Sequence, residues 1–521
     1  MNIRPLSSFL SRFPLLIALL AGALNVLAFA PFHFWPLQIA SLALLFGLVL
    51  RTPARAFLLG WSYGFGCFLF GVYWLYLTMH RFGHLPAPLA GLAIVLFALL
   101  LGVFGAIAME AGMRLARRWQ ATPAVTLLAL LPCMWTLLEW VRGWIFTGFP
   151  WLAAGYAHTA DPLAGFAPIV GVYGVGWLAA LIAGTIVLAP IRKTALGLAL
   201  ILLVAGFALK SVAWTEPAGR PISVRLLQGN VPQEEKFERA QLGESLMMYE
   251  AMLREAPADL IVTPETAIPM LLQQLPPDYI DGLEKFAQRT QSHLALGIFS
   301  MPAPQQYMNS MIELSPQSAA GAPLYRYGKH HLVPYGEFIP FGFRWFTDMM
   351  QIPLGDQAGG AELQAPFAVK DQWVLPNICY ENLFGEEIAK QLAARYVAGL
   401  PQPTILLNLS NLAWYDEWLA IPQHLQISQM RALETGRPML SATNTGATAI
   451  VNPHGEVVAE LQPYTRGALT ATVQGFHGVT PYVRFGNALF LVLVALLLGM
   501  AWFLGRRNRR PDAREKPRTR T

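Results

Sequence analysis

The sequence predicts a protein in two parts, a polytopic α-helical membrane domain and an exported α/β domain. Of its 521 residues, 55% are hydrophobic and only 13% are charged, whereas a typical soluble domain carries roughly 25% charged residues. Long uncharged apolar runs fill residues 1–212 and recur near the C-terminus, while residues 213–482 have the mixed composition of a globular domain. A single soluble domain is therefore excluded.

The apolar runs define the expected membrane helices. Most are close to the roughly 20 residues that a helix needs to cross a bilayer. We expect seven spans within residues 1–212, one more at 483–505, and a basic tail at 506–521. The runs cover residues 13–30, 36–50, 56–79, 86–109, 122–138, 167–190, 194–209 and 485–505.

The charges of the loops predict the orientation. Arginine and lysine gather before the first run, after each even-numbered run and in the tail, as the positive-inside rule requires if both termini are cytoplasmic. The domain at 213–482 is then extracytoplasmic, on the periplasmic or extracellular side of the membrane. The tail holds eight of the basic residues behind the net charge of +6, and the rest of the chain is neutral, so we expect no nucleic-acid partner.

Apolar strands alternate with amphipathic helices in residues 213–482, a pattern typical of an α/β layered domain with buried sheets. The expected strands are Ile222–Gln228, Leu260–Pro264, Leu294–Phe299, Met308–Leu314, Trp373–Cys379, Thr404–Leu409 and Met439–Val451. The expected helices are Leu242–Glu255, Asp278–Ser292, Phe384–Arg395 and Trp418–Thr435.

Three segments next to strands carry candidate chemistry. Glu265 ends the segment Leu-Ile-Val-Thr-Pro-Glu, Lys329 precedes His-His-Leu-Val-Pro-Tyr-Gly-Glu, and Cys379 begins Cys-Tyr-Glu. Cys379 is the only cysteine of the exported domain, so it has no disulfide partner there. A thiol, a carboxylate to take its proton and a cation to stabilise an oxyanion suffice for acyl transfer.

The order of these three segments resembles the Glu-Lys-Cys triad of the nitrilase superfamily. Seven spans before the domain and one after it resemble the membrane-embedded branch of that superfamily, the apolipoprotein N-acyltransferases. The resemblance extends to Leu-Ala-Phe-Ala-Pro-Phe after the first run, Thr-Gly-Phe-Pro-Trp after the fifth, and Gln-Gly-Asn-Val-Pro-Gln at the start of the domain. It implies an αββα sandwich, with Glu265 as general base, Lys329 as oxyanion-stabilising cation and Cys379 as nucleophile.

The resemblance also implies the reaction. A fatty acyl chain would pass from a phospholipid, through a thioester, to the α-amino group of a lipidated N-terminal cysteine of an apolipoprotein. Two alternatives stay open: a membrane-tethered amidase that passes its acyl group to water, and a transporter whose exported domain only binds solute. The transporter alternative leaves the triad unexplained. We expect no cofactor and no metal, since Lys329 supplies the positive charge and the histidines lack ligand spacing.

Further residues receive secondary roles. Glu337 and Glu381 are expected to hold Lys329 charged and oriented, with Tyr380 beside them. The aromatic segment after Glu337 is interpreted as a lipid-facing access loop, because aromatic side chains favour the membrane interface. Glu139 and Arg142, three residues apart, are interpreted as a structural pair. The residues of the access loop are Phe341, Trp345 and Phe346.

Overall fold

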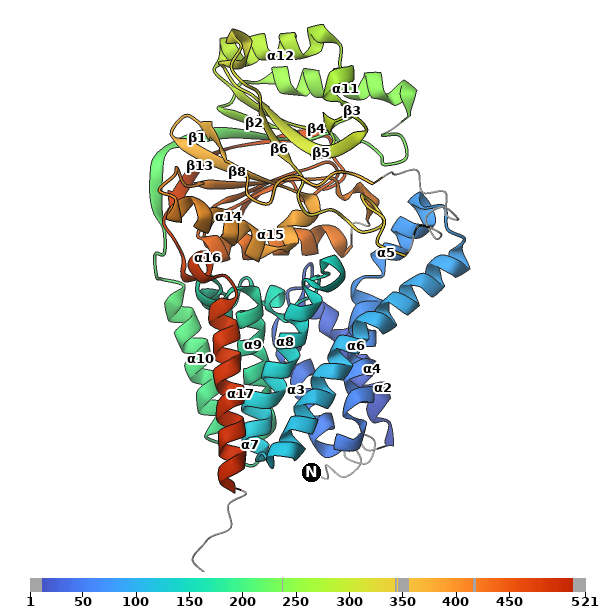
Figure 1. Ribbon diagram of the computed structural model, residues 1–521, viewed down its shortest axis with the longest axis vertical. Helices are drawn as coiled ribbons and strands as arrows, with labels where there is room; N and C mark the ends of the chain where they lie inside the picture. Colours follow the sequence, from blue (N-terminus) through green and yellow to red (C-terminus); the bar gives the residue numbers. More distant parts are fainter. Residues whose placement is uncertain (1–11, 237, 343, 345–355, 416–417, 509–521) are drawn as a thin grey trace, which may run out of the picture.

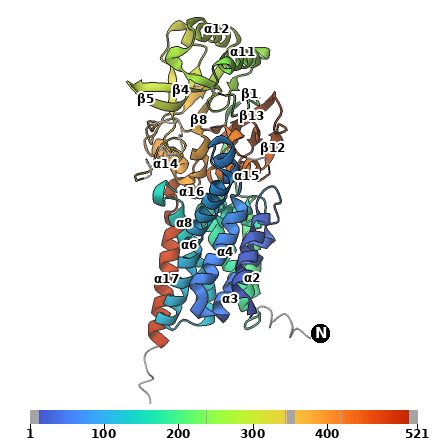
Figure 2. The ribbon, with the colours of Figure 1, turned by 90° about the vertical axis from the view of Figure 1, so that its right-hand side faces the viewer.

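Helices and sheets separate into two parts in the computed structural model (Figure 1). The structure describes residues 12–236, 238–342, 344, 356–415 and 418–508. Helices that lie side by side form a bundle at one end, and a layered α/β domain lies on top of it (Figures 1 and 2). The chain enters the α/β domain after the helix α10 and returns to the bundle through the helix α17, so both ends of that domain face the bundle.

Each expected apolar run contains a helix of the bundle. The longest, α6, has 33 residues, which corresponds to about 50 Å. Its N-terminal end slants away from the bundle and lies beside the α/β domain with α5 (Trp74–Leu77). The bundle helices are α2 (Pro14–Asn25), α3 (Pro36–Arg51), α4 (Ala56–Gly71), α6 (Ala87–Trp119), α7 (Pro123–Val125), α8 (Leu131–Arg142), α9 (Ala167–Leu188), α10 (Ala195–Leu209) and α17 (Ala488–Asn508).

Helices able to cross a membrane are present in this bundle. Among the described residues, four helical stretches are long and apolar enough, and five if the sharply bent pair α3 and α4 counts as one span. The helices α2 and α10 are apolar but shorter. The chain is therefore a membrane protein, and the eight expected crossings stay a prediction. The four stretches are Ala87–Trp119, Pro123–Arg142, Pro162–Leu188 and Ala488–Arg507.

Two mixed sheets form the centre of the α/β domain. The first has the order β13-β1-β2-β4-β5-β6, with β3 also paired to β4, and the second has the order β12-β11-β10-β9-β8-β7. The strands β1, β2 and β4 are parallel to one another, as are β8, β9 and β10. The strands of the first sheet are β1 (Glu216–Gln228), β2 (Leu260–Val262), β3 (Ile268–Leu271), β4 (His293–Ala303), β5 (Gln306–Leu314), β6 (Tyr325–Gly328) and β13 (Gly467–His477). Those of the second are β7 (Phe367–Val369), β8 (Gln372–Ile378), β9 (Ile405–Ser410), β10 (Met439–Thr443), β11 (Ala449–Val451) and β12 (Val457–Glu460).

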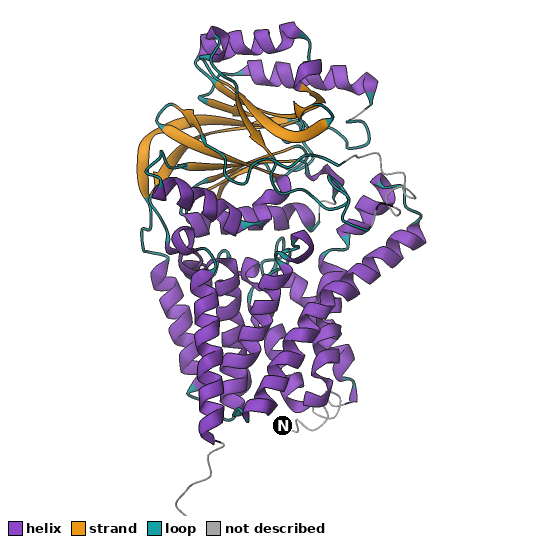
Figure 3. Ribbon diagram, in the orientation of Figure 1, coloured by secondary structure: helices purple, strands orange, loops and turns teal. Residues whose placement is uncertain are grey.

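Helices cover the outer face of each sheet. The helices α11 (Arg239–Glu255) and α12 (Pro277–Thr290) lie on the first sheet, and α14 (Gly385–Val397) and α15 (Ala420–Thr435) lie on the second, between it and the bundle (Figures 1 and 3). Separate apolar cores fill the space between the sheets and under each helix layer. These four layers confirm the expected αββα sandwich.

One expected strand was wrong. Met439–Val451 is a hairpin, because residues 444–448 turn the chain and β10 and β11 pair antiparallel. Gly446 adopts a φ of +148° in this turn, a conformation that glycine tolerates best. The sequence pattern also missed β13, which is the antiparallel neighbour of β1 along ten residue pairs. Half-exposed side chains along β13 hide the alternation that marks a strand.

The bundle and the sandwich share a continuous core. Apolar side chains of η10 (Cys379–Leu383) and α15 belong to the same buried cluster as those of the membrane helices. Hydrogen bonds cross the junction as well: the amide of Ala30 donates to Gln426, and the Trp151 indole donates to Gln423 at 2.6 Å. Such a large apolar junction fixes the position of the sandwich on the bundle.

Glu139 and Arg142, interpreted as a structural pair, both have a structural role, but each binds the backbone of the loop after α8. Within the part of the chain that the structure describes, these two side chains form no ion pair with each other. Glu139 instead accepts the backbone N–H of Ala154 at 3.1 Å. Arg142 donates to the carbonyl of Trp151 at 2.8 Å and to that of Phe149. Both charges therefore hold the loop that follows α8.

Candidate active site

Three loops from different strands converge in the sandwich. Glu265 follows β2, Lys329 follows β6, and Cys379 follows β8. The strand β2 lies in the parallel part of the first sheet, and β8 lies in the parallel part of the second. The carboxyl ends of both strands lie at the same edge of the sandwich. This edge is where α/β sheets collect ligand-binding side chains. The structure therefore brings together the three residues that the sequence placed in separate segments.

Unusual backbone conformations present two of these side chains. Cys379 has a φ of +53° at the junction between β8 and η10, and Thr266, directly after Glu265, has a φ of +46°. Residues other than glycine hold such angles only where their surroundings fix them, often at functional sites. Gly297 of β4 permits the Glu265 turn, because a Cβ atom there would lie 2.1 Å from the carbonyl oxygen of Pro264.

Lys329 lies between two carboxylates. Its Nζ is 2.7 Å from Glu337 Oε1 and 3.2 Å from Glu265 Oε1, and only 1% of the lysine is exposed. The amide of Asn309 donates to the same two oxygens, at 3.1 Å and 2.7 Å. Glu265 also accepts the backbone N–H of Asn411 at 2.8 Å and a hydrogen bond from the Cys379 thiol. The cluster thus connects acid, cation and thiol directly.

The electrostatics assign a protonation state to each group. Burial acts to lower the pKa of Lys329, but the charges of Glu265 and Glu337 outweigh it and raise that pKa well above its ordinary value. Burial acts to raise the pKa of Glu265, but Lys329, a second lysine, Lys236, and Asn309 lower it below its ordinary value. Burial and the charge of Glu265 raise the pKa of the Cys379 thiol. The resting site therefore holds an ammonium, a carboxylate and a neutral thiol.

Glu337 and Glu381 have different hydrogen-bond partners. Glu337 contacts Lys329, as expected. Glu381 makes no ion pair with Lys329 within the described residues, and burial raises its pKa. It accepts the N–H groups of Ile378 and His330, at 2.5 and 2.7 Å, and the hydroxyl of Tyr327. Glu381 therefore ties the Cys379 turn to the Lys329 loop, which is a different role from the one the sequence suggested.

Tyr380 joins the site to the membrane bundle. It is buried, and its hydroxyl donates to the carbonyl of Gly148 at 2.7 Å. Gly148 belongs to the loop after α8. The residue next to Cys379 is thus held by the membrane domain.

Several residues of the site were not anticipated from the sequence. Lys236 is 3% exposed, and its Nζ contacts the Glu265 carbonyl at 3.2 Å and the Thr266 hydroxyl at 2.6 Å. Burial lowers its pKa to about 8. Burial likewise lowers the pKa of His424 to about 4, and this ring hydrogen-bonds to the backbone of Cys379. The segment Gln-Gly-Asn-Val-Pro-Gln just before Lys236 was the only available signal, and it does not single out the lysine.

The expected access loop lies largely outside the described residues. Trp345 and Phe346 both fall there, so their placement is not described. Phe341 is described, and its side chain is fully exposed.

The arrangement suits acyl transfer. Glu265 can accept a proton from Cys379, and Lys329 can stabilise negative charge developing beside the sulfur. No group of three or more histidine, cysteine or acidic side chains in the described part of the chain could hold a metal ion. Every charge that this chemistry uses comes from a side chain of the cluster.

Two family models match the two parts of the chain. Residues 21–185 match the model of the apolipoprotein N-acyltransferase N-terminal domain, and residues 223–480 match the carbon-nitrogen hydrolase model. Among solved structures, Saccharomyces cerevisiae Nit3, a member of branch 10 of the nitrilase superfamily, is 16% identical with a TM-score of 0.36. That match covers 49% of this chain and 91% of the other.

Curated relatives match over nearly the whole length. The apolipoprotein N-acyltransferase of Ralstonia nicotianae is 48% identical over 96% of this chain and 94% of its own. That of Nitrosomonas europaea is 42% identical over 95% of this chain and 99% of its own. The chain belongs to the apolipoprotein N-acyltransferase family.

Proposed function

We propose that this acyltransferase moves a fatty acyl chain from a phospholipid to the α-amino group of a diacylglyceryl-modified apolipoprotein, through a thioester on Cys379. The observation that carries the proposal is the contact of Glu265 with both Lys329 and the Cys379 thiol. The neighbouring Tyr380 touches the membrane domain, so the thiol lies next to the part of the protein that meets lipid.

The first half-reaction forms the thioester. Glu265 takes the thiol proton while Sγ attacks the ester carbonyl carbon of the phospholipid. The high pKa of the thiol and the low pKa of Glu265 make this transfer uphill, so the proton moves as the C–S bond forms. Lys329 stabilises the oxyanion. The C–O bond then breaks, and Glu265 returns the proton to the alkoxide of the departing lysophospholipid.

The second half-reaction repeats the same chemistry with an amine. The neutral α-amino group of the apolipoprotein attacks the thioester carbon, Glu265 takes its proton, and Lys329 again stabilises the oxyanion. The C–S bond breaks, and the proton returns to the sulfur. Splitting the transfer in two means that the two lipid-anchored substrates need not meet at one time. A thioester is also more reactive toward amines than the original ester.

The membrane arrangement belongs to the same proposal. Residues 1–212 form seven spans, residues 213–482 the periplasmic catalytic domain, residues 483–505 the last span and residues 506–521 a cytoplasmic tail, in a bacterial inner membrane. The supports are the basic loops and the return of the chain from the sandwich through α17. Both substrates would then reach Cys379 with their acyl chains still in the bilayer.

Mass spectrometry of the purified protein incubated with phospholipid alone tests the mechanism. We expect an acyl adduct on Cys379 and an equal amount of lysophospholipid, and we expect no adduct in Glu265→Gln. An apolipoprotein peptide added afterwards should remove the adduct and become acylated. A Cys379→Ala protein that still acylates the peptide would refute the thioester route. Release of free fatty acid in place of acylated peptide would favour the amidase.

A further inference from the structure

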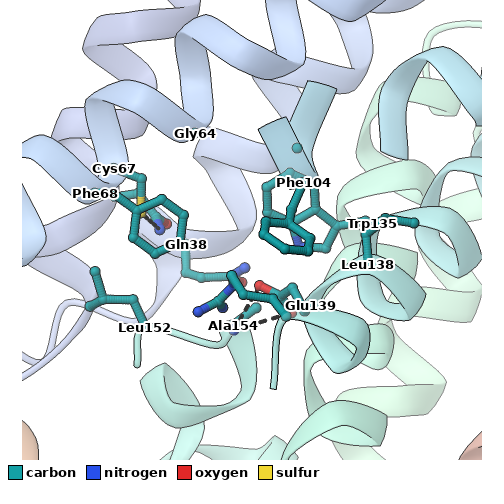
Figure 4. Close-up of a pocket in the computed structure, with 13 residues that line it drawn as sticks. Gln38, Gly64, Cys67, Phe68, Phe104, Trp135, Leu138, Glu139, Leu152 and Ala154 are labelled. Atoms are coloured by element: carbon teal, nitrogen blue, oxygen red, sulfur yellow. Dashed lines mark hydrogen bonds between the residues drawn. The ribbon is translucent and has the colours of Figure 1, made fainter. Parts of the chain in front are cut away.

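A small cavity inside the membrane bundle is lined mainly by neutral side chains, with one acid and one base among them. Its volume is about 30 Å³, and Glu139 on α8 lies at its edge (Figure 4). Arg142, also on α8, borders the same cavity. The cavity is separate from the cluster around Cys379. Charges inside a membrane domain are costly and commonly functional, yet the proposed chemistry uses neither of these two. The other side chains at the cavity include Asn25, Gln38, Cys67 and Trp135.

Both charges act on the loop after α8. Glu139 accepts the N–H of Ala154, which Figure 4 shows beside it, and Arg142 donates to the carbonyls of Phe149 and Trp151. The guanidinium also lies 4.9 Å from the centroid of the Phe68 ring. An acid and a base thus hold the backbone of this loop from inside the bundle.

The beginning of the same loop is strained. Phe146 and Thr147 have φ angles of +54° and +73°, followed by +84° at Gly148. Consecutive residues keep positive φ angles only where the surrounding structure fixes them. A Cβ atom on Gly148 would lie 2.1 Å from the carbonyl oxygen of Gly143, so the chain passes close to the end of α8. The hydrogen bonds of Arg142 come directly after this run and fix its geometry.

The strained carbonyls point into the catalytic domain. That of Gly148 accepts the Tyr380 hydroxyl at 2.7 Å, and that of Thr147 lies 2.8 Å from His331 Nε2. The His331 ring stacks on Phe384, with centroids 3.6 Å apart. Tyr380 follows Cys379 directly, and Cys379 itself has a positive φ. A continuous set of contacts therefore runs from the bundle to the turn that presents the thiol.

We infer that Arg142 is a positioning residue for Cys379, acting through the Gly148 carbonyl and Tyr380. The buried guanidinium at the end of α8 fixes the 146–151 backbone, and this backbone fixes the turn that aims Sγ at Glu265. The membrane domain then sets the reactivity of the thiol in addition to anchoring the sandwich. The inference deepens the proposed function, because it takes Cys379 as the nucleophile.

The test is a double-mutant cycle on the full-length protein in detergent. The variants are Arg142→Lys, Tyr380→Phe and the double variant, and the readout is the rate at which iodoacetamide modifies Cys379. Peptide mass spectrometry separates Cys379 from Cys67 and Cys133. Arg437→Lys is the matched control, because Arg437 is also buried on backbone carbonyls, those of Pro403, Thr435 and Gly478.

We expect each single variant to slow the modification about tenfold, the scale of a small misplacement of a reacting group. The double variant should be no slower than Arg142→Lys alone, because both changes break the same connection. Arg437→Lys should keep the wild-type rate. In the transfer assay, Arg142→Lys should lower kcat and leave KM for the phospholipid unchanged.

Two results would overturn the inference. One is a double variant slowed by the product of the single effects, and the other is an Arg142→Lys protein that behaves like Arg437→Lys. If Arg142→Lys does not fold, Gly148→Ala takes its place in the cycle, since it moves the same carbonyl and keeps the buried charge. The iodoacetamide rate measures the geometry of the thiol and does not depend on the acyl-transfer mechanism. Transfer retained by Cys379→Ala would therefore refute the proposed function without deciding this inference.

Discussion

Replacing Glu337 by glutamine tests how the charge of Lys329 is held. The carboxylate of Glu337 meets donors only: Lys329 Nζ at 2.7 Å and Asn309 Nδ2 at 3.1 Å on one oxygen, and the backbone N–H of Val333 at 2.8 Å on the other. Glutamine has one acceptor oxygen and one donor nitrogen. Either orientation of the introduced amide therefore points an N–H group at another donor.

The size of the effect follows from these contacts. A hydrogen bond to a charged group contributes about 1.5–3 kcal/mol, and a buried donor left without an acceptor costs about 1–3 kcal/mol. The sum of these two contributions agrees with the roughly 3–5 kcal/mol of stability that is lost when one partner of a buried ion pair is removed. Because Lys329 then shifts toward Glu265 and away from the oxyanion, we expect Cys379 acylation to slow by about 10²-fold, as for the loss of one oxyanion donor.

The assay is the single-turnover rate of adduct formation on Cys379, measured with the thermal unfolding of the same protein. Glu313→Gln is the matched control: Glu313 is also buried and pairs with His293 at 2.8 Å, but it lies four residues along β5 from Asn309, roughly 13 Å away. The control should lose stability and keep its acylation rate. Wild-type acylation in Glu337→Gln, or equal slowing in both variants, would refute this reasoning.

Four further predictions test other parts of the molecule. Lys236→Met removes a cation that lowers the pKa of Glu265, so that pKa should rise and the acid limb of the kcat/KM profile should move to higher pH; an unchanged limb would contradict this. Glu381→Gln should lower the unfolding temperature and slow acylation, because its carboxylate also meets donors only, and unaltered values in both assays would exclude the role. A reporter fused after Tyr482 that is active only in the cytoplasm should stay inactive, and an active one would reverse the topology. Phe341→Ser should reduce transfer from vesicle phospholipid more than transfer from a short soluble ester, whereas equal losses would remove this residue from lipid access.

Those parts of the fold that produce a local sequence pattern could be predicted. Apolar runs marked every helix of the bundle, and apolar strands ending in a polar residue located Glu265 and Cys379. Met439–Val451 failed because a hairpin between two apolar strands has the same composition as one long strand. Asn309 was missed because only the pairing of β5 with β6 places it beside Lys329. Contacts that depend on strand order leave no local signal in the sequence.

The net charge of the cluster around Lys329 could not be predicted from the sequence. Lys329 alone faces two buried carboxylates, Glu265 and Glu337, so the predicted site carries a net negative charge next to a thiol that must become a thiolate. Lys236 balances that charge: burial lowers its pKa to about 8, which still leaves most of it protonated at neutral pH. Two cations and two carboxylates form a neutral set, and buried charges persist only when they are compensated in this way. When a proton leaves Cys379 for Glu265, these four side chains together gain one positive charge, which offsets the negative charge of the new thiolate, and Lys329 remains charged where the oxyanion forms. The long-range placement of Lys236 is thus what permits a carboxylate base and a neutral thiol to share one buried site.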